Sequence, residues 1–331
     1  MDTGTPQRGQ LPTRPLGRTG YQVSVLGVGG WLGRLEDPAL SAADRERAAI
    51  AAVRRAVELG VIYFDTSPAY GPNVEAERHL GLGLRALGGA ERARLRVATK
   101  TGTHPARRNR YDADSTRWSV DQSLRNLFAK SIDVLLVHDP RDDADLDAAL
   151  APGGAVETLE RLKTDGVVGA IGLGVRTHRF LRRAIESGRF DVILTPYDYT
   201  LLRASAAPVI ELAVSHDVGV INGSPYGAGL LAGIDPDVAA QKRQPLSAPD
   251  LARARALWRW CRDHDLDLGA VAMQYSLRHP GIATTLVGPR TAEEVDGNLR
   301  HATTPLPETL WAELDSFMES LGPPAPGGEA K

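Results

Sequence analysis

The sequence of 331 residues has a single cysteine, few aromatic residues and no long apolar run. Cys261 alone cannot form an internal disulfide, which excludes the disulfide-rich secreted class. No stretch approaches the roughly 18 apolar residues of a membrane-spanning helix. The first ten residues lack the apolar segment of a secretory signal. We therefore expect a soluble cytoplasmic protein with no membrane partner.

An excess of charge of either sign is also lacking. There are 39 Lys and Arg residues against 41 Asp and Glu residues, a formal net charge of -2. No block of like charge is long enough to form a nucleic-acid-binding arm, so we expect no nucleic-acid partner. We also expect no bound metal. Apolar residues make up 42% of the chain and charged residues 24%, which is a globular composition.

Short runs rich in Val, Ile and Leu recur along the chain, each followed by a segment with apolar residues at helical spacing. This pattern predicts successive βα units. The expected strands cover residues 25–30, 61–67, 95–100, 133–139, 168–175, 192–198, 219–225 and 284–289. They are mostly apolar rather than alternating, which is typical of buried parallel strands.

Two architectures fit such a series, a closed (β/α)8 TIM barrel or an open doubly wound sheet. The number of runs favours the α/β barrel. Residues 15–24 predict a small β-hairpin ahead of the first strand, turning at Arg18–Gly20. We expect extended βα loops, with a long excursion over 228–283 that carries two amphipathic helices. One domain should span 13–321, with disordered ends at 1–12 and 322–331.

An open-sheet dehydrogenase would place G-x-G-x-x-G directly after its first strand, where the backbone approaches a pyrophosphate. After the first expected strand here, Gly27, Gly29 and Gly33 put the third glycine one place too late. Gly172 and Gly174 are followed by Thr177 where the last glycine should stand. Small residues in a crowded barrel explain both clusters better, and the doubly wound alternative loses its main support.

Chemistry in a TIM barrel takes place at the carboxyl ends of the strands. Asp65 lies near the end of the second expected strand and Tyr70 just beyond it. Lys100 lies at the end of the third expected strand and His138 at the end of the fourth. Each alone has an ordinary explanation, as a turn cap, a surface charge or a buried structural histidine. Together they would converge on one mouth of one barrel.

This group of residues suggests proton transfer at a carbonyl. A carboxylate beside Lys100 would hold the ammonium in place, and the ammonium would lower the pKa of Tyr70 from its ordinary value of about 10. A neutral His138 could donate a hydrogen bond to the substrate oxygen beside that hydroxyl. The implied reaction couples this proton to hydride transfer at the carbonyl carbon, which requires a nicotinamide cofactor.

Five motifs occur in order along the chain: D-T-S-P-A-Y-G at 65–71, A-T-K at 98–100, V-H-D at 137–139, S-P-Y-G-A-G-L-L at 224–231 and V-G-P-R-T-A-E-E-V-D-G-N at 287–298. With these motifs the chain resembles the aldo-keto reductase superfamily from Arg14 to about Ala302. The resemblance implies a (β/α)8 barrel, NAD(P)(H) bound across its mouth, and catalysis by Asp65, Tyr70, Lys100 and His138.

The loops after the seventh and eighth strands of such barrels commonly bind phosphate through backbone N–H groups. By resemblance, the cofactor-binding residues are Ser224, Gly227, Gly229, Leu230, Gly288, Arg290, Thr291, Glu294 and Asn298. Arg290 would attract the 2′-phosphate of NADP and Glu294 would repel it, which predicts dual use of NAD and NADP. The resemblance also places Trp31 at the substrate pocket, together with Tyr70 and His138.

Three departures concern the nicotinamide site. Gly174–Val175 stand where the family has Ser-Asn, Pro196 where it has Gln, and Gly223 where an aromatic residue stacks under nicotinamide. These features resemble the branch that contains D-threo-aldose (L-fucose) 1-dehydrogenases and pyridoxal 4-dehydrogenase.

We therefore expect an NAD(P)-dependent oxidoreductase that interconverts an aldehyde, ketone or aldose with an alcohol or lactone. Two alternatives belong to other functional classes. A nicotinamide-binding regulatory subunit would bind the cofactor without turnover, and a Schiff-base lyase would use Lys100 as its nucleophile. The oligomeric state, the physiological direction and the exact substrate are not specified by these motifs.

Overall fold

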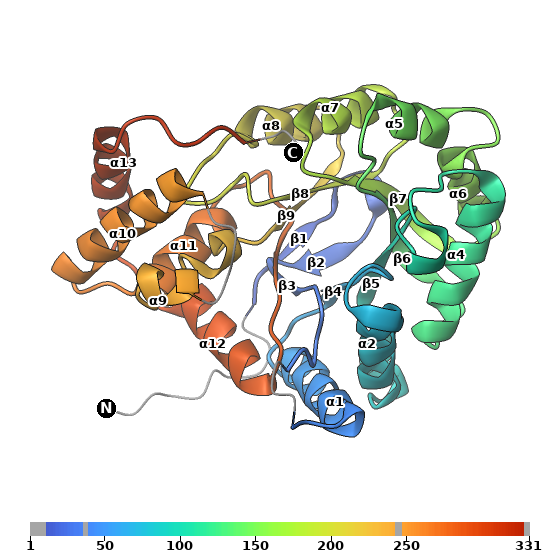
Figure 1. Cartoon of the computed structure of the whole chain (residues 1–331), viewed down its shortest axis with the longest axis horizontal. Helices are drawn as coiled ribbons and strands as arrows, with labels where there is room; N and C mark the ends of the chain where they lie inside the picture. Colours follow the sequence, from blue (N-terminus) through green and yellow to red (C-terminus); the bar gives the residue numbers. More distant parts are fainter. Residues whose placement is uncertain (1–10, 36–38, 242–246, 328–331) are drawn as a thin grey trace.

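The computed structural model describes residues 11–35, 39–241 and 247–327. Eight parallel strands form the centre of the molecule (Figure 1). They close into a barrel because β10 pairs with both β9 and β3. The barrel strands are β3 (Leu26–Val28), β4 (Tyr63–Asp65), β5 (Arg96–Thr101), β6 (Ile132–His138), β7 (Val168–Gly174), β8 (Val192–Pro196), β9 (Gly219–Gly223) and β10 (Thr284–Val287). Each expected run covers one of these strands, except that Thr101 of β5 and Ile132 of β6 lie one residue outside the runs 95–100 and 133–139. The closed sheet confirms the barrel, and the doubly wound alternative is wrong.

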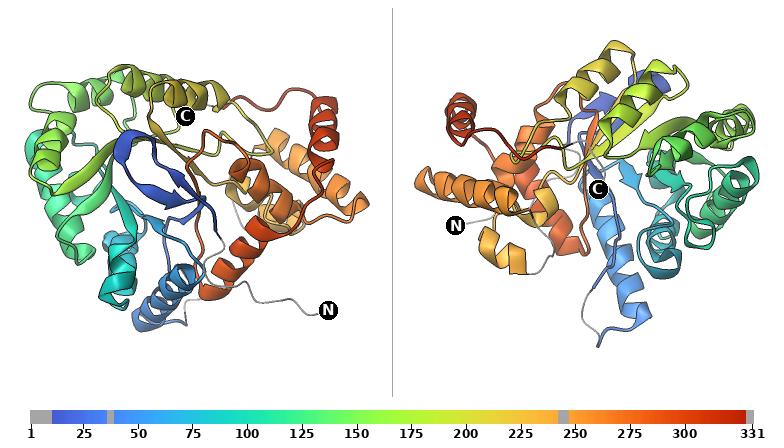
Figure 2. Two further views of the ribbon diagram at one scale, coloured as in Figure 1. Left: turned by 180° about the vertical axis from the view of Figure 1, so that it is seen from behind. Right: turned by 45° about the horizontal axis from the view of Figure 1, so that its top comes forward.

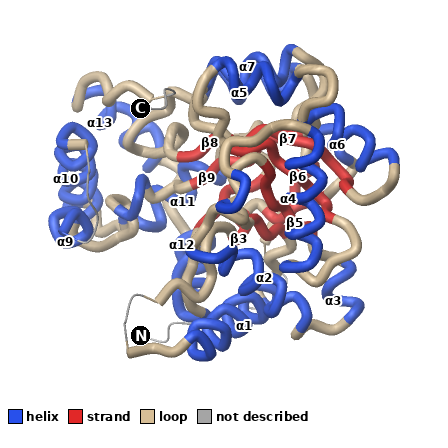
Figure 3. The backbone as a smooth tube through the Cα atoms, turned by 45° about the vertical axis from the view of Figure 1, so that its right-hand side comes forward, coloured by secondary structure: helices blue, strands red, loops and turns tan. Residues whose placement is uncertain are grey.

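Helices surround the barrel, as Figure 3 shows for the strands in red and the helices in blue. Those before β8 are α1 (Ala42–Glu58), α2 (Glu75–Arg85), α3 (Gly89–Ala93), α4 (Ala113–Asn126), α5 (Asp143–Leu150), α6 (Ala155–Thr164) and α7 (His178–Glu186). Those after β8 are α8 (Ala207–Ser215), α9 (Pro236–Gln241), α10 (Ala248–Asp263), α11 (Leu268–Leu277), α12 (Ala292–Thr303) and α13 (Leu310–Ser320). The apolar faces of α1, α2, α4 to α8, α11 and α12 pack on the outer side of the strands to form the main core.

The predicted hairpin is present as β1 (Thr13–Pro15) and β2 (Gln22–Ser24), joined through a short 3-10 turn, η1 (Gly17–Thr19). It lies across the amino-terminal end of the barrel (Figure 2). Leu16 and Val23 from this hairpin are buried among interior side chains such as Val192 and Ile221. The hairpin therefore closes the end of the barrel opposite to the carboxyl ends of the strands.

The excursion after β9 differs from the expectation of two amphipathic helices. Its described residues form α9, α10 and α11. In α11, residues 268–273 are all buried, so this helix has no polar stripe that periodicity could detect. It packs with α10 and α13 in a second apolar cluster beside the barrel, which includes Leu257 and Trp311.

The two ends of the chain bear on the predicted limits of the domain, 13–321. Residues 1–10 and 328–331, part of the expected disordered ends, lie outside the described residues. Within the described C-terminal segment, Arg253 donates to the carbonyl oxygen of Gly322 and Arg203 to that of Ala325. The limits of the single domain stay a prediction. No helix among the described residues is long and apolar enough to cross a membrane.

Candidate active site

The interior side chains of the barrel form layers, and the uppermost layer contains the site. Alternate residues of a strand point inward, and the inward set includes Tyr63, Ala98 and Leu136. Two residues further along each strand, at the carboxyl end, come Asp65, Lys100 and His138. On the remaining strands the equivalent positions are Gly29, Gly174, Pro196, Gly223 and Gly288. One half of the layer is therefore ionisable and the other half is small.

Asp65 and Lys100 form a buried ion pair at the centre of this layer. The ammonium nitrogen lies 2.5 Å from Asp65 Oδ1 and 2.7 Å from the carbonyl oxygen of Thr66. Only 1% of the Lys100 surface is exposed. Burial alone would lower the pKa of Lys100. The charges of Asp65 and Tyr70 raise it by more than burial lowers it, so the pKa of Lys100 lies above its ordinary value. Lys100 is therefore a fixed ammonium ion.

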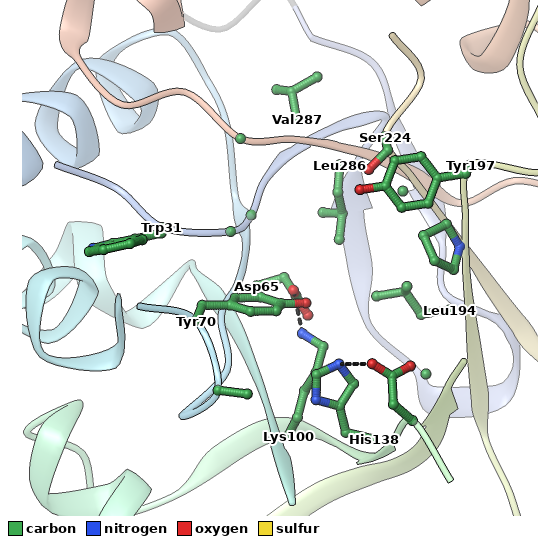
Figure 4. A pocket seen from close by; sticks show the side chains of 18 of the residues that line it. Trp31, Asp65, Tyr70, Lys100, His138, Leu194, Tyr197, Ser224, Leu286 and Val287 are labelled. Carbon is green, nitrogen blue, oxygen red and sulfur yellow. Dashed lines mark hydrogen bonds and ion pairs between the residues drawn. The ribbon is translucent and has the colours of Figure 1, made fainter. Parts of the chain in front are cut away.

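Tyr70 follows β4 and lies over the ion pair. Its ring centroid is 4.9 Å from Lys100 Nζ and 5.8 Å from the His138 ring, which meets it edge-on (Figure 4). Burial raises the pKa of Tyr70 to about 12, while the Lys100 charge lowers it by less. The expected lowering by Lys100 is present, but the expected net decrease is wrong, because desolvation of a buried phenolate outweighs the nearby cation.

His138 is held through both ring nitrogens. Thr103 Oγ1 lies 2.6 Å and Ser67 Oγ 3.4 Å from Nδ1, and Asp139 Oδ2 lies 3.3 Å from Nε2. Burial, with a smaller effect from Lys100, lowers the pKa of His138 well below its ordinary value, so the ring is neutral. A carboxylate only accepts hydrogen bonds, which assigns the proton to Nε2 and makes Nδ1 the acceptor. His138 thus presents an N–H group to the cavity.

A cavity of about 660 Å³ opens above this layer, lined by the four expected catalytic residues and by Trp31, Ser224 and Arg290. Pockets of this size hold small ligands and parts of cofactors. A Cβ atom added at Gly29, Gly223 or Gly288 would meet its nearest neighbour at 3.4 Å, an ordinary contact. The fold itself does not require glycine at these positions, and their lack of side chains leaves open space beside the ionisable residues.

The first expected phosphate loop follows β9 and contains the 3-10 turn η4 (Gly227–Gly229). The N–H of Ser224 donates to the carbonyl oxygen of Leu286, and those of Gly227, Gly229 and Leu230 donate within the loop. These N–H groups are therefore already bonded, unlike the free donors that we expected. The Ser224 hydroxyl lies at the cavity wall (Figure 4).

The second expected phosphate loop carries an internal ion pair. Arg290 contacts Glu294 through Nη2 at 2.6 Å and Nε at 3.0 Å, and its backbone N–H donates to the same carboxylate. Thr291 caps α12 by accepting from the N–H of Glu294. Arg290 and Glu294, which were expected to act in opposite directions on the 2′-phosphate, therefore bind each other, and both remain partly exposed.

Asn298, the expected adenine contact, lies one turn further along α12. Its Oδ1 is 3.0 Å from the hydroxyl oxygen of Tyr226, which is also 2.8 Å from Nδ1 of His301. This contact links α12 to the loop after β9. Asn298 is thus oriented by neighbours that the motifs did not indicate.

Trp31, the expected substrate residue, lies at the cavity with its ring packed flat against Gly71, beside Tyr70. Asp139 and Tyr197 also line the cavity, although the sequence motifs assigned neither of them to the site. Both have a positive φ, 43° and 69°, which is uncommon for residues other than glycine. The motif V-H-D contained Asp139, but no periodicity predicts its backbone conformation.

Comparison with known proteins agrees with this geometry. The family model for the Aldo/keto reductase family matches residues 25–319. The chain is 31% identical to L-galactose dehydrogenase of Arabidopsis thaliana, covering 94% of this chain and 93% of that protein. It is 32% identical to D-threo-aldose 1-dehydrogenase of a Pseudomonas species, covering 80% and 86%.

A third relative is pyridoxal 4-dehydrogenase of Microbacterium luteolum, 30% identical over 92% of this chain and 96% of that protein. A solved aldo-keto reductase-like structure from Pseudomonas aeruginosa superposes with a TM-score of 0.65 at 26% identity, covering 91% of this chain and 98% of that one. The similarity in sequence and fold thus extends over most of the chain.

Proposed function

The chain belongs to the aldo-keto reductase family and is an NAD(P)-dependent oxidoreductase, and we propose that Tyr70 exchanges the proton in its reaction. The substrate is a small carbonyl compound, an aldehyde, ketone or aldose, which is interconverted with an alcohol or lactone. The observation that carries the proposal is the convergence of Asp65, Tyr70, Lys100 and His138 on one cavity.

Tyr70 and Lys100 act together in proton transfer. In reduction the phenol gives its proton to the carbonyl oxygen, and in oxidation the phenolate takes a proton from the hydroxyl group. The Lys100 ammonium lies against the Tyr70 ring and favours the phenolate. Asp65 keeps that ammonium charged and in place.

His138 orients the substrate. Its Nε2–H group faces the cavity, and a carbonyl oxygen that accepts this hydrogen bond lies near the Tyr70 hydroxyl. Thr103 fixes the ring and its tautomer by donating to Nδ1 at 2.6 Å. A neutral donor suits both reaction directions, because it neither adds nor removes charge at the reacting oxygen.

The nicotinamide cofactor supplies or accepts the hydride when bound. Small residues on five strands leave room for its ring opposite the ionisable half of the layer. For the rest of the cofactor we propose the loop residues Ser224, Gly227, Gly229, Leu230, Gly288, Arg290, Thr291, Glu294 and Asn298. The neutral pair of Arg290 and Glu294 supports use of both NAD and NADP.

An aldose is the favoured substrate. Two of the relatives at about 30% identity are named as L-galactose and D-threo-aldose dehydrogenases. The cavity combines an aromatic surface, Trp31, with polar groups at its base, which suits a sugar with an apolar face and polar edges.

The structure disfavours a Schiff-base lyase. A nucleophilic lysine must be neutral and accessible. Lys100 is buried and paired with Asp65, and its pKa is raised, so it stays charged. The test is borohydride trapping with substrate and no cofactor, which we expect to leave Lys100 unmodified. A regulatory subunit without turnover would bind cofactor but reduce no member of a carbonyl panel.

The experiment that tests the proposal is turnover of a panel of aldoses and aldehydes with NAD, NADP and their reduced forms. Tyr70→Phe should lower kcat at least about 100-fold, because the general acid is removed, and should leave cofactor binding intact. Tyr21→Phe, in the hairpin at the far end of the barrel, is the matched control. Near-normal turnover by Tyr70→Phe would exclude Tyr70 as the proton donor.

A further inference from the structure

Asp139 follows β6 directly after His138 and lines the cavity. Its backbone has a φ of 43°, a left-handed conformation that costs free energy in residues with a side chain. The conformation is held by the N–H of Asp139, which donates to the carbonyl oxygen of Gly174 at 2.9 Å. Strain of this kind is often retained where it aims a side chain into a functional site.

The carboxylate lies beside the donor group that we assign to the substrate oxygen. Asp139 Oδ2 is 3.3 Å from His138 Nε2, and 60% of the Asp139 side chain is exposed. When a substrate oxygen accepts the Nε2–H bond, this carboxylate loses its partner and faces the neighbouring part of the substrate. In an aldose, the group next to the reacting carbon is a hydroxyl, which can donate to it.

We propose that Asp139 accepts a hydrogen bond from a substrate hydroxyl next to the reacting carbon and selects neutral hydroxylated substrates over anionic ones. This inference rests on the proposed function. It adds a specificity-determining residue to the site, and it gives the chemical class of the substrate as polyhydroxylated and uncharged.

Two physical effects act in the same direction. A hydrogen bond to a carboxylate is roughly twice as strong as one between neutral groups. A substrate carboxylate at this position would be repelled by a like charge a few ångströms away, in a partly desolvated site.

The cations at the cavity do not neutralise Asp139 directly. Lys100 is paired with Asp65, and Arg290 with Glu294. Arg34 lies over the Trp31 ring, 5.4 Å from its centroid. The region next to the His138 donor is therefore acidic.

The test compares Asp139→Asn with wild type on three substrates: L-galactose, benzaldehyde and 4-carboxybenzaldehyde. Asparagine also tolerates the left-handed conformation, so the fold should be preserved, which an unchanged Tm verifies. Asp217→Asn is the matched control, because Asp217 has a φ of 54° and its carbonyl oxygen bonds the hairpin at the closed end of the barrel.

With Asp139→Asn we expect kcat/KM for L-galactose to fall about tenfold, mainly through KM, and kcat/KM for 4-carboxybenzaldehyde to rise at least about fivefold. Benzaldehyde should change less than about twofold, as it has neither hydroxyl nor charge. The control should resemble wild type on all three substrates.

Parallel changes on all three substrates would overturn the proposal, because they indicate a general loss of activity. So would an unchanged ratio between L-galactose and 4-carboxybenzaldehyde, in which case the proposed function would still stand if benzaldehyde is reduced. Failure of wild type to turn over any of the three substrates with either cofactor would instead contradict the proposed function, and this inference with it.

Discussion

At the scale of single residues, two opposing effects set the protonation of Tyr70. Burial favours the neutral phenol and the Lys100 ammonium favours the phenolate, with burial the larger. A phenol that stays protonated at neutral pH is ready to donate in reduction. Oxidation needs the phenolate, so it should become faster as the pH rises toward the pKa of Tyr70.

Lys100→Met should shift this pH dependence. Without the cation the pKa of Tyr70 rises. The pH at which the rate of oxidation increases should therefore be higher by about one unit or more. The measurement is the pH profile of kcat for alcohol or aldose oxidation. Because Lys100→Met leaves Asp65 buried and unpaired, the double variant Asp65→Asn/Lys100→Met should be measured too. An unmoved profile in both variants would show that Lys100 does not control Tyr70.

The ion pair of Arg290 and Glu294 leads to a prediction about cofactor choice. Glu294→Gln removes the carboxylate that holds the guanidinium and should raise the ratio of kcat/KM for NADP to that for NAD about threefold or more. Glu294→Arg should raise the ratio at least about tenfold, equal to about 1.4 kcal/mol.

Glu293→Gln, at the next position of α12, provides the control for charge alone. If neither Glu294 variant alters the ratio relative to this control, the N-terminus of α12 does not face the 2′ position of the ribose.

At the scale of secondary-structure elements, the hairpin contributes stability rather than chemistry. Leu16 is fully buried and packs against the backbone at Gly219, where β9 begins. Leu16→Ala should lower the free energy of unfolding by about 2–5 kcal/mol and leave KM for substrate and cofactor unchanged. Denaturant unfolding and steady-state kinetics test the two parts, and an altered KM would indicate that the closed end communicates with the site.

The sequence predicted the elements well where one physical signal dominated. Buried parallel strands are continuous apolar runs, and the run expected over 133–139 matches β6 to within one residue at each end. The hairpin turn was expected at Arg18–Gly20, and Gly20 has a positive φ. By contrast, the excursion over 228–283 was expected to carry two amphipathic helices, whereas its described residues form three. One of them, α11, is buried on almost all sides and lacks the polar stripe by which periodicity detects a helix.

The residues of the site also fall into two groups, those that the sequence could place and those that it could not. Asp65, Lys100 and His138 could be placed because strand ends of a barrel meet at one mouth. Thr103, Asp139 and Tyr197 could not, because loop conformation decides their positions. The net pKa of Tyr70 also depends on burial in three dimensions, which a motif does not give.

At the scale of the whole molecule, the mouth of the barrel joins an ionisable half to a half built from small residues. If the cofactor fills the second half, binding should stabilise the folded state by about 2.7 kcal/mol at a concentration 100 times its Kd. We expect the Tm to rise by several degrees with NAD or NADP, and equally in Tyr70→Phe. A Tm unaffected by both cofactors would contradict the assignment of this half.

The closed end of the barrel also constrains the order of events in turnover. With Leu16 and Val23 filling the amino-terminal end, both reactants reach the chemistry through the mouth and both products depart through it. If one reactant lies across the other at this mouth, the outer one must leave before the inner one is released. The order of departure is then set by the architecture, and a departure slower than hydride transfer limits the overall rate.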